Sequence, residues 1–112
     1  MTYKMFDVVS IPFPFTDGPQ TKRRPALVLS SHTALNDVIE HSVMAMITSA
    51  KNTAWPLDMP ITDLARAGLS AASVVRMKLF TLDHRFISQK IGVLSLQDQI
   101  SLKPLLRTLF PL

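Results

Sequence analysis

The apolar residues of this chain occur in short runs that prolines and turn residues interrupt, and only one segment shows helical spacing. Residues 5–11 are rich in β-forming side chains, and residues 26–30, 73–77 and 80–82 are further short runs of this kind. Runs bounded by proline, glycine and polar residues are typical of β-strands. Because the chain has 112 residues, these strands must share one small core, since two domains would each be too short to build one.

Residues 39–48 are the longest expected strand, because their side chains partly alternate. Ile39, Val43, Ala45 and Ile47 fall on one face, and Glu40, Ser42, Met44, Met46 and Thr48 fall on the other, outward face. A short strand is expected over residues 56–60. Residues 62–68 predict a capped helical turn that starts at Thr62 or Asp63 and closes at Gly68.

Turn signals separate the first two strands. Pro12, Phe13 and Pro14 are expected to end the ladder pairing of the first strand. The Thr-Asp-Gly-Pro sequence of residues 16–19 predicts a turn, since glycine accepts a positive φ and proline follows it.

The only substantial helix is expected at the C-terminus, where Ser95 and Asp98 are close to a capping box. Four leucines then recur at helical spacing, namely Leu102, Leu105, Leu106 and Leu109. Pro104 lies inside this pattern and should kink or restart the helix. Several short strands and one terminal helix predict a mainly β fold, a small, partly open antiparallel barrel on which the helix packs.

Composition narrows the class of protein. A hydrophobic fraction of 47% fits a folded chain, and no apolar run approaches the roughly 18 residues of a membrane helix. Polar residues and prolines interrupt the apolar N-terminal stretch, which argues against a secretory signal. The absence of cysteine excludes disulfides, a thiolate nucleophile and cysteine-ligated metals, so a reducing cytoplasm is the expected setting. The net charge of +4 is compatible with a nucleic acid partner but is weak evidence alone.

The sharpest local feature is a basic segment. Lys22, Arg23 and Arg24 are consecutive cations between a glycine turn and an apolar strand. Pro25 biases Arg24 towards an extended backbone, so the Arg24 side chain projects from a defined strand entrance. Guanidinium groups can grip a phosphate and oppose the charge that builds up during phosphoryl transfer. The same residues equally fit a solvated basic loop, and both interpretations stay open.

The remaining polar residues give weaker signals. The Thr48 hydroxyl could bond a substrate oxygen, although threonine is common in strands. Arg76 and Lys78 form either a second cationic patch or a wet strand face. The three histidines are isolated and lack the spacing of metal ligands, and the three glycines are too far apart for a phosphate-binding loop or a dinucleotide fingerprint.

Two N-terminal segments carry a resemblance to a known family. FDVVSIPFPFTDG at residues 6–18 and KRRPALVLS at residues 22–30 resemble the N-terminal signature of the MazF/PemK family, the ribonuclease toxins of type II toxin–antitoxin systems. GL at residues 68–69, SVVR at 73–76, LFTLD at 79–83 and KIGVLS at 90–95 resemble the second half of the family. Together these segments cover nearly the whole chain in the right order, which is more specific than any single motif.

The resemblance implies an SH3-like small barrel of the CcdB/MazF type with a C-terminal helix, spanning residues 1–112 as a single toxin domain. It also implies a homodimer that cuts single-stranded RNA at short preferred sequences, without a metal or other cofactor, and that a cognate antitoxin silences. The family's catalytic arginine falls on Arg24, and its catalytic threonine falls on Thr48. The implied RNA-binding residues are Lys22, Arg23, Arg76 and Lys78.

A metal-free reaction is chemically reasonable because RNA carries its own nucleophile. The 2′-hydroxyl attacks the adjacent phosphorus and leaves a 2′,3′-cyclic phosphate and a 5′-hydroxyl, while the protein positions the strand and stabilises the phosphorane. Arg24 suits the phosphorane but is a poor general base, because arginine stays protonated in proteins. Thr48 can orient or relay a proton. The acceptor of the 2′-hydroxyl proton stays open, with His84 as one candidate.

One departure from the family pattern bears on catalysis. Some relatives carry V-R-x-D with an aspartate that contributes to the chemistry, whereas Val75 and Arg76 are followed here by Met77 and Lys78. A catalytically weak RNA- or antitoxin-binding module is therefore one alternative to an active nuclease. A gyrase-poisoning toxin of the same fold is another, although the R-R-P and L-F-T-L-D segments argue against it. RNA cleavage separates the active nuclease from both alternatives.

Overall fold

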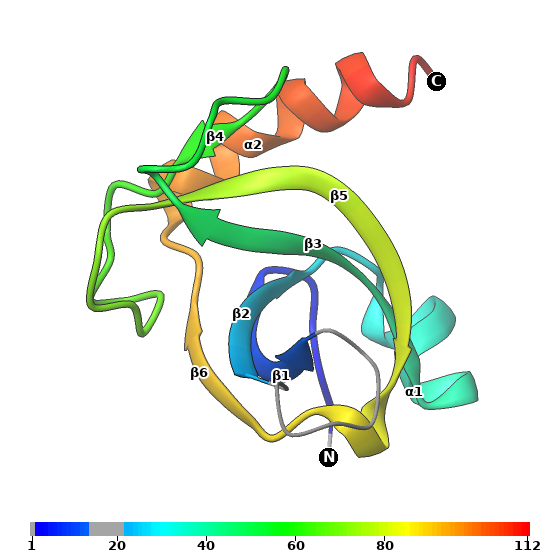
Figure 1. The fold of residues 1–112 in the computed structure, drawn as a ribbon. Helices are drawn as coiled ribbons and strands as arrows, with labels where there is room; N and C mark the ends of the chain where they lie inside the picture. The colour runs from blue at the N-terminus through cyan, green and yellow to red at the C-terminus, as the bar shows by residue number, and fades with distance from the viewer. Residues whose placement is uncertain (1, 14–21) are drawn as a thin grey trace.

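The computed structural model describes residues 2–13 and 22–112, so the expected turn at residues 16–19 lies outside the described part. Within that part, six strands form one antiparallel sheet: β1 (Asp7–Phe13), β2 (Lys22–Val28), β3 (His41–Ser49), β4 (Met59–Pro60), β5 (Ser73–Asp83) and β6 (Gln89–Val93). Their order is β4-β5-β3-β2-β1-β6. Figure 1 shows the sheet curling so that β3 and β5 arch over β1 and β2, with helix α2 (Leu96–Leu109) across the outside. The predicted mainly β, partly open barrel with a terminal helix is confirmed.

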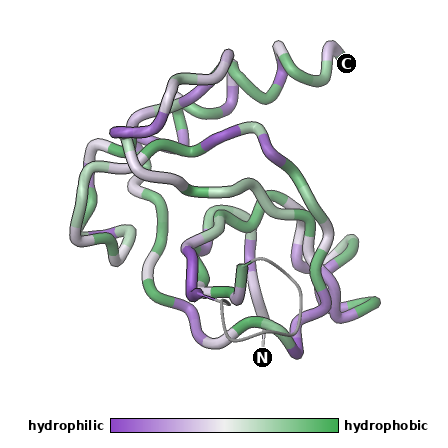
Figure 2. The backbone as a smooth tube through the Cα atoms, viewed as in Figure 1, coloured by the Kyte–Doolittle hydropathy of each residue, from purple (hydrophilic) through white to green (hydrophobic). Residues whose placement is uncertain are grey.

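Both faces of the curled sheet are buried, and each carries its own apolar cluster. Figure 2 shows hydrophobic residues recurring along the strands. The outer cluster joins Leu27, Ala45 and Ile47 of the sheet to Leu102 of α2. The inner cluster contains Met44 and Met46, among others. Successive side chains of a strand point to opposite faces, so both sets of β3 residues are covered. The prediction of an outward, polar face on β3 was therefore wrong: Ser42 is fully buried.

Three expected strand boundaries were also wrong, the first of them because Pro12 occupies a position where β1 has a partner on one side only. β1 stays paired through Pro12 and Phe13, which lie opposite Arg23 and Lys22. Its pairing with β6 ends at Ser10, so Pro12 removes no donor needed on that side. Residues 73–77 and 80–82 form the single strand β5, and the strand expected over residues 56–60 shortens to β4.

Besides β6, three further elements were not predicted by the sequence pattern. His32–Asn36 forms a π-helical turn, η1, which continues into the short helix α1 (Asp37–Ile39). Residues 84–86 form a 3₁₀ turn, η2 (His84–Phe86), which leads into β6. Neither these segments nor α2 forms a helix long and apolar enough to cross a membrane, within the part of the chain described.

Helix α2 begins as predicted but does not break at its proline. The Ser95 hydroxyl caps the helix by accepting a hydrogen bond from the Asp98 amide at 3.1 Å. Pro104 lies inside the continuous helix, contrary to the expected restart. Its ring is exposed, so water can satisfy the carbonyl that loses its helical partner.

The carboxylate of Asp98 does not complete a capping box and instead fastens the chain before β5 to α2. It is fully buried and accepts hydrogen bonds from the backbone amides of Thr62 and Asp63 and from the Thr62 hydroxyl at 2.7 Å. The turn expected at residues 62–68 is present, with Asp63 capping the Arg66 amide and Gly68 at a φ of 75°. This turn packs so closely on β6 that a Cβ atom at Gly92 would collide with the backbone of Ala67.

Candidate functional site

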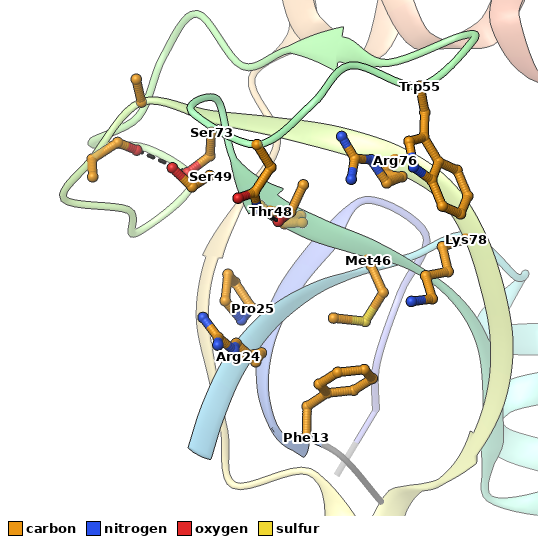
Figure 3. A pocket seen from close by; sticks show the side chains of 14 residues that line it. Phe13, Arg24, Pro25, Met46, Thr48, Ser49, Trp55, Ser73, Arg76 and Lys78 are labelled. Atoms are coloured by element: carbon orange, nitrogen blue, oxygen red, sulfur yellow. Dashed lines mark hydrogen bonds between the residues drawn. The ribbon is translucent and has the colours of Figure 1, made fainter. Parts of the chain in front are cut away.

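A cavity of about 290 Å³ opens where β2 and β3 separate. β3 pairs with β2 only as far as Met46, whereas it stays paired with β5 to Ser49. The first half of β2 and the last residues of β3 therefore face each other across a gap that no backbone hydrogen bonds fill. Figure 3 shows this cavity, with Arg24 and Thr48 on one side of it and Arg76, Trp55 and Lys78 on the other.

Four of the six residues predicted from the sequence line this cavity, namely Arg24, Thr48, Arg76 and Lys78. Lys22 and Arg23 do not, and line a second cavity with Arg85 and Phe86. Strand alternation separates Arg23 from Arg24, whereas Lys22, which has the same parity as Arg24, lies at the start of β2 and lines the second cavity with Arg23. The fold thus divides the continuous basic segment between two places.

Arg24 is exposed at the mouth of the cavity, opposite Ile11 of β1. No side chain among the described residues forms a hydrogen bond or ion pair with its guanidinium group. Pro25 precedes the point at which β2 joins β3, so Arg24 stands on a strand whose other edge is open. A guanidinium group held on a strand and left unpaired is suited to bind an anion.

The Thr48 hydroxyl lies near the end of β3 and is half-buried. Its oxygen accepts a hydrogen bond of 2.6 Å from the side-chain amide of Asn52. Because the amide uses an oxygen lone pair, the Thr48 hydroxyl can still donate its own hydrogen. Asn52 therefore orients Thr48 as a donor towards whatever occupies the cavity.

Arg76 is buried and already has a carboxylate partner. Its Nε and one terminal nitrogen donate to Asp58 at 3.2 and 3.0 Å, and the same terminal nitrogen donates to the Thr53 carbonyl at 2.8 Å. The hydrogen bond from Arg76 is the main cause that lowers the pKa of Asp58, and the Trp55 amide adds to it. The same bond raises the pKa of Arg76. The carboxylate beside Arg76 thus comes from the segment before β4 and not from β5.

Trp55 forms an aromatic wall of the cavity. The Arg76 guanidinium lies 5.0 Å from the Trp55 ring centre, and the Lys78 ammonium lies 6.0 Å from it. Lys78 also lies 5.7 Å from the Phe13 ring, so this cation stands between two aromatic side chains. Since 44% of Trp55 remains exposed, a flat ligand can still reach its ring. Trp55, Phe13 and Met46 give this side of the cavity an apolar lining.

His84 lies at the other end of β3 and does not line the cavity. Its Nε2 is 2.7 Å from the Ser42 hydroxyl, and its ring packs edge-on against Tyr3. Ser42 and Thr48 are six residues apart on one strand, which corresponds to about 20 Å. Across residues 2–13 and 22–112, no three acidic or histidine side chains gather closely enough to hold a metal ion.

Sequence reasoning missed two groups at the cavity, Asn52 and Asp58. Asn52 follows the end of β3 by three residues, a position where a side-chain amide commonly closes a turn. Asp58 offers no local signal that it would pair with a residue 18 positions away. Together, the cavity offers a guanidinium that pairs with no other described residue, an oriented hydroxyl and an aromatic wall flanked by cations.

Comparison with known proteins adds the family context. A family model described as PemK-like, MazF-like toxin of type II toxin–antitoxin system matches residues 4–110. A search among curated proteins found no relative that matches the chain.

Solved structures share the fold at low sequence identity. MazF from Deinococcus radiodurans (Form-I) is 22% identical with a TM-score of 0.75, and the match covers 100% of this chain and 99% of that one. The toxin MazF-mt6 of Mycobacterium tuberculosis is 20% identical with a TM-score of 0.74, covering 95% and 97%. A mycobacterial endoribonuclease in complex with its cognate antitoxin is 14% identical with a TM-score of 0.75, covering 99% and 95%. These similarities confirm the expected barrel type.

Proposed function

The chain belongs to the PemK-like, MazF-like toxins of type II toxin–antitoxin systems, and on this premise we propose that it is a sequence-selective endoribonuclease that cuts single-stranded RNA without a metal ion. The observation that carries the proposal is that Arg24 and Thr48, which are distant in sequence, line one cavity beside Trp55. The cavity combines groups that bind phosphate with a surface on which a base can stack, and single-stranded RNA presents both.

Arg24 and Thr48 are the proposed catalytic residues. Arg24 binds the scissile phosphate and stabilises the negative charge of the pentacoordinate phosphorane, which its unpaired guanidinium can do. Thr48, whose oxygen accepts from Asn52, donates its hydrogen to a phosphate oxygen or relays a proton. The bond from the 2′-oxygen to phosphorus forms as the bond to the 5′-oxygen breaks. The 2′-hydroxyl releases its proton to water, and the 5′-oxygen takes up a proton from water as it leaves.

The other cations have binding roles in this proposal. Lys78 contacts RNA at the aromatic wall, and Lys22 and Arg23 contact the strand outside the first cavity. Arg76 contacts RNA through the face of the guanidinium that borders the cavity, while Asp58 holds it against Trp55. Phosphates then give affinity, and the pocket beside Trp55 gives preference for particular bases.

The partners proposed are a cognate antitoxin and a second copy of this chain, within the cytoplasm and with residues 1–112 acting as one toxin domain. MazE–MazF complexes of Deinococcus radiodurans are among the solved structures of this fold. An acidic antitoxin segment would be attracted to Lys22, Arg23 and Arg24 and would cover the RNA site. Saturating antitoxin should therefore abolish RNA binding, and RNA binding that persists would contradict a shared surface.

The first test is cleavage of a long single-stranded RNA by the purified protein with EDTA present. We expect cuts at a recurring short sequence, with 2′,3′-cyclic phosphate ends. Arg24→Ala should lower the rate by at least about 100-fold, as loss of a transition-state donor does in other enzymes. Arg66→Ala, which removes an exposed arginine outside the cavity, is the matched control and should cleave normally. A folded Arg24→Ala protein that cleaves at the full rate would refute the assignment.

A second candidate function is RNA or antitoxin binding without cleavage. Its support is that Lys78 stands where some relatives have an aspartate, and that the carboxylate beside Arg76 is engaged in an ion pair. This candidate predicts that the protein binds RNA, quenching the fluorescence of Trp55, but leaves it uncut. Inhibition of gyrase without RNA binding would instead indicate a gyrase poison of the same fold.

A further inference from the structure

The two cations that the first cavity leaves out have an aromatic neighbour. Lys22 and Arg23 line a second cavity of about 450 Å³ together with Arg85 and Phe86 of η2. Among the described residues, three that line it are cationic and none is acidic. The proposed catalytic groups do not lie in it, so the proposed reaction does not explain it.

A third cavity of about 240 Å³ connects the first two across β2. Arg24 borders both the first and the third cavity, and Arg23 borders both the second and the third. The third cavity thus shares one cation with each of the other two, and the series runs from the β3 side of β2 towards β1 and η2. A polyanion leaving the catalytic cavity past Arg24 would meet Arg23 next and η2 after that.

The side chains of η2 are arranged to receive a base. The Phe86 ring is 47% exposed, and the Arg85 guanidinium lies 5.1 Å from its centre. The Arg85 Nε lies 3.2 Å from a carboxylate oxygen of Asp83, and the Asp83 side chain also accepts a hydrogen bond from the Arg85 backbone amide. An aromatic ring and a guanidinium plane are both surfaces on which unpaired bases stack. The exposed Phe86 ring lies in the same cavity as Lys22 and Arg23, so a nucleotide could stack its base on the ring and bind its phosphate to the cations.

We propose that the RNA strand extends from the catalytic cavity across β2 and places a flanking nucleotide against Phe86 and Arg85, with Lys22 and Arg23 binding its phosphates. The proposal rests on the proposed function, since it assigns a second subsite of the same substrate. It makes efficient cleavage depend on nucleotides beyond the cut sequence, on one side of the scissile bond only.

The experiment measures kcat/KM for RNA oligonucleotides that contain one cut site and are shortened from either end. For wild type, kcat/KM should fall in one step when the flanking nucleotide is removed from one end. Phe86→Ala should lower kcat/KM by about 10-fold for the long RNA, the size expected for one stacked base. It should leave the shortened RNA unaffected. Phe110→Ala, which removes an equally exposed ring at the far end of α2, is the control (Figure 1).

A second measurement tests stacking directly. In a long RNA with a 2′-deoxy nucleotide at the cut site, which cannot be cleaved, an abasic nucleotide at the flanking position should weaken binding to wild type. It should not weaken binding to Phe86→Ala.

Equal losses in both proteins would overturn the subsite, as would a Phe86→Ala protein whose kcat/KM depends on RNA length as that of wild type does. A changed oligomeric state of Phe86→Ala in solution would assign the ring to a subunit contact and would also overturn the subsite. If wild type cleaves no RNA, the proposed function fails, and the binding measurement still decides the subsite.

Discussion

At the scale of single residues, Asp58 organises one wall of the candidate site. It receives two hydrogen bonds from Arg76 and one of 2.9 Å from the Trp55 amide. Arg76 in turn lies against the Trp55 ring, so one carboxylate sets the positions of both a cation and an aromatic platform. Asp58 does not line the cavity itself, and it acts as a positioning residue.

Asp58→Asn should loosen Trp55 and reduce kcat/KM for RNA by about 10-fold, because a neutral amide cannot hold the guanidinium with two charged hydrogen bonds. The effect should appear mainly in KM. Trp55 is the single tryptophan of the chain, so its fluorescence and its quenching by iodide report its position directly. Asp63→Asn, which changes an exposed aspartate away from the cavity, is the control. Unchanged fluorescence and unchanged KM would show that Asp58 does not position Trp55.

His84 makes the stability of the fold depend on pH. Burial is the main cause that lowers its pKa from 6.5, and His41 adds to the shift while Asp83 and Glu40 oppose it. As the pH falls below 6.5, the unfolded chain binds a proton at this histidine before the folded chain does, so the free energy of unfolding decreases. His84→Gln should remove this part of the decrease, and His32→Gln should not. Urea unfolding at a series of pH values measures the free energy of unfolding. If its pH dependence were the same for wild type and His84→Gln, His84 would not be the source of the decrease.

At the scale of elements, α2 shows how packing outweighs a local preference. Its proline costs one backbone hydrogen bond, but Leu102 is fully buried in the outer cluster and holds the helix to the sheet. The Ser95 cap and the buried Asp98 fix the start of the helix. These contacts keep the helix continuous through a residue that would end an isolated one.

Pro104→Ala should stabilise the protein, since it restores an amide donor and removes a poor helix former from an exposed position. We expect a gain of about 1 kcal/mol or more and a rise in Tm of about 4 °C or more. Ser101→Ala changes an exposed residue of the same helix and should have the smaller effect. A lower Tm for Pro104→Ala would mean that the proline contributes a contact or relieves strain.

At the scale of the whole molecule, five exposed or partly exposed cations lie along one series of cavities. Lys22, Arg23, Arg24 and Lys78 line cavities that open beside β2, and Arg85 continues the series at η2. A net charge of +4 is modest, so this local arrangement matters more than the total. Phosphate contacts release counterions from RNA, which makes binding depend on salt.

Affinity for an uncleavable RNA should fall linearly on a plot of log K against log salt concentration. About four phosphate contacts would give a slope of about −2.8 at 0.7 per contact for a single strand. Lys22→Ala should reduce the steepness by about 0.7, whereas Lys51→Ala, an exposed lysine outside the cavities, should leave it unchanged. Equal slopes for both variants and wild type would show that Lys22 contacts no phosphate.

The sequence by itself determined the mainly β character of the chain, most of its strands and its terminal helix. The β-forming runs, the Ser95 cap and the turn closed by Gly68 depend on a few neighbouring residues, and each is present in the structure. The family signature likewise placed Arg24 and Thr48 on strand positions, because the motifs that carry it are local. The sequence predicted the ends of strands less well. The end of β1 at Pro12, for example, depends on whether the strand has a partner on one side or on both.

The tertiary structure alone decided which side chains meet. The burial of both faces of β3, the pairing of Ser42 with His84 and the pairing of Asp58 with Arg76 all follow from the curl and register of the sheet. The division of Lys22, Arg23 and Arg24 between cavities depends on where each residue lies along β2 relative to the ends of β3 and to η2. Such contacts join residues far apart in the chain, and their free energy is realised only when the whole sheet closes, so no local pattern encodes them.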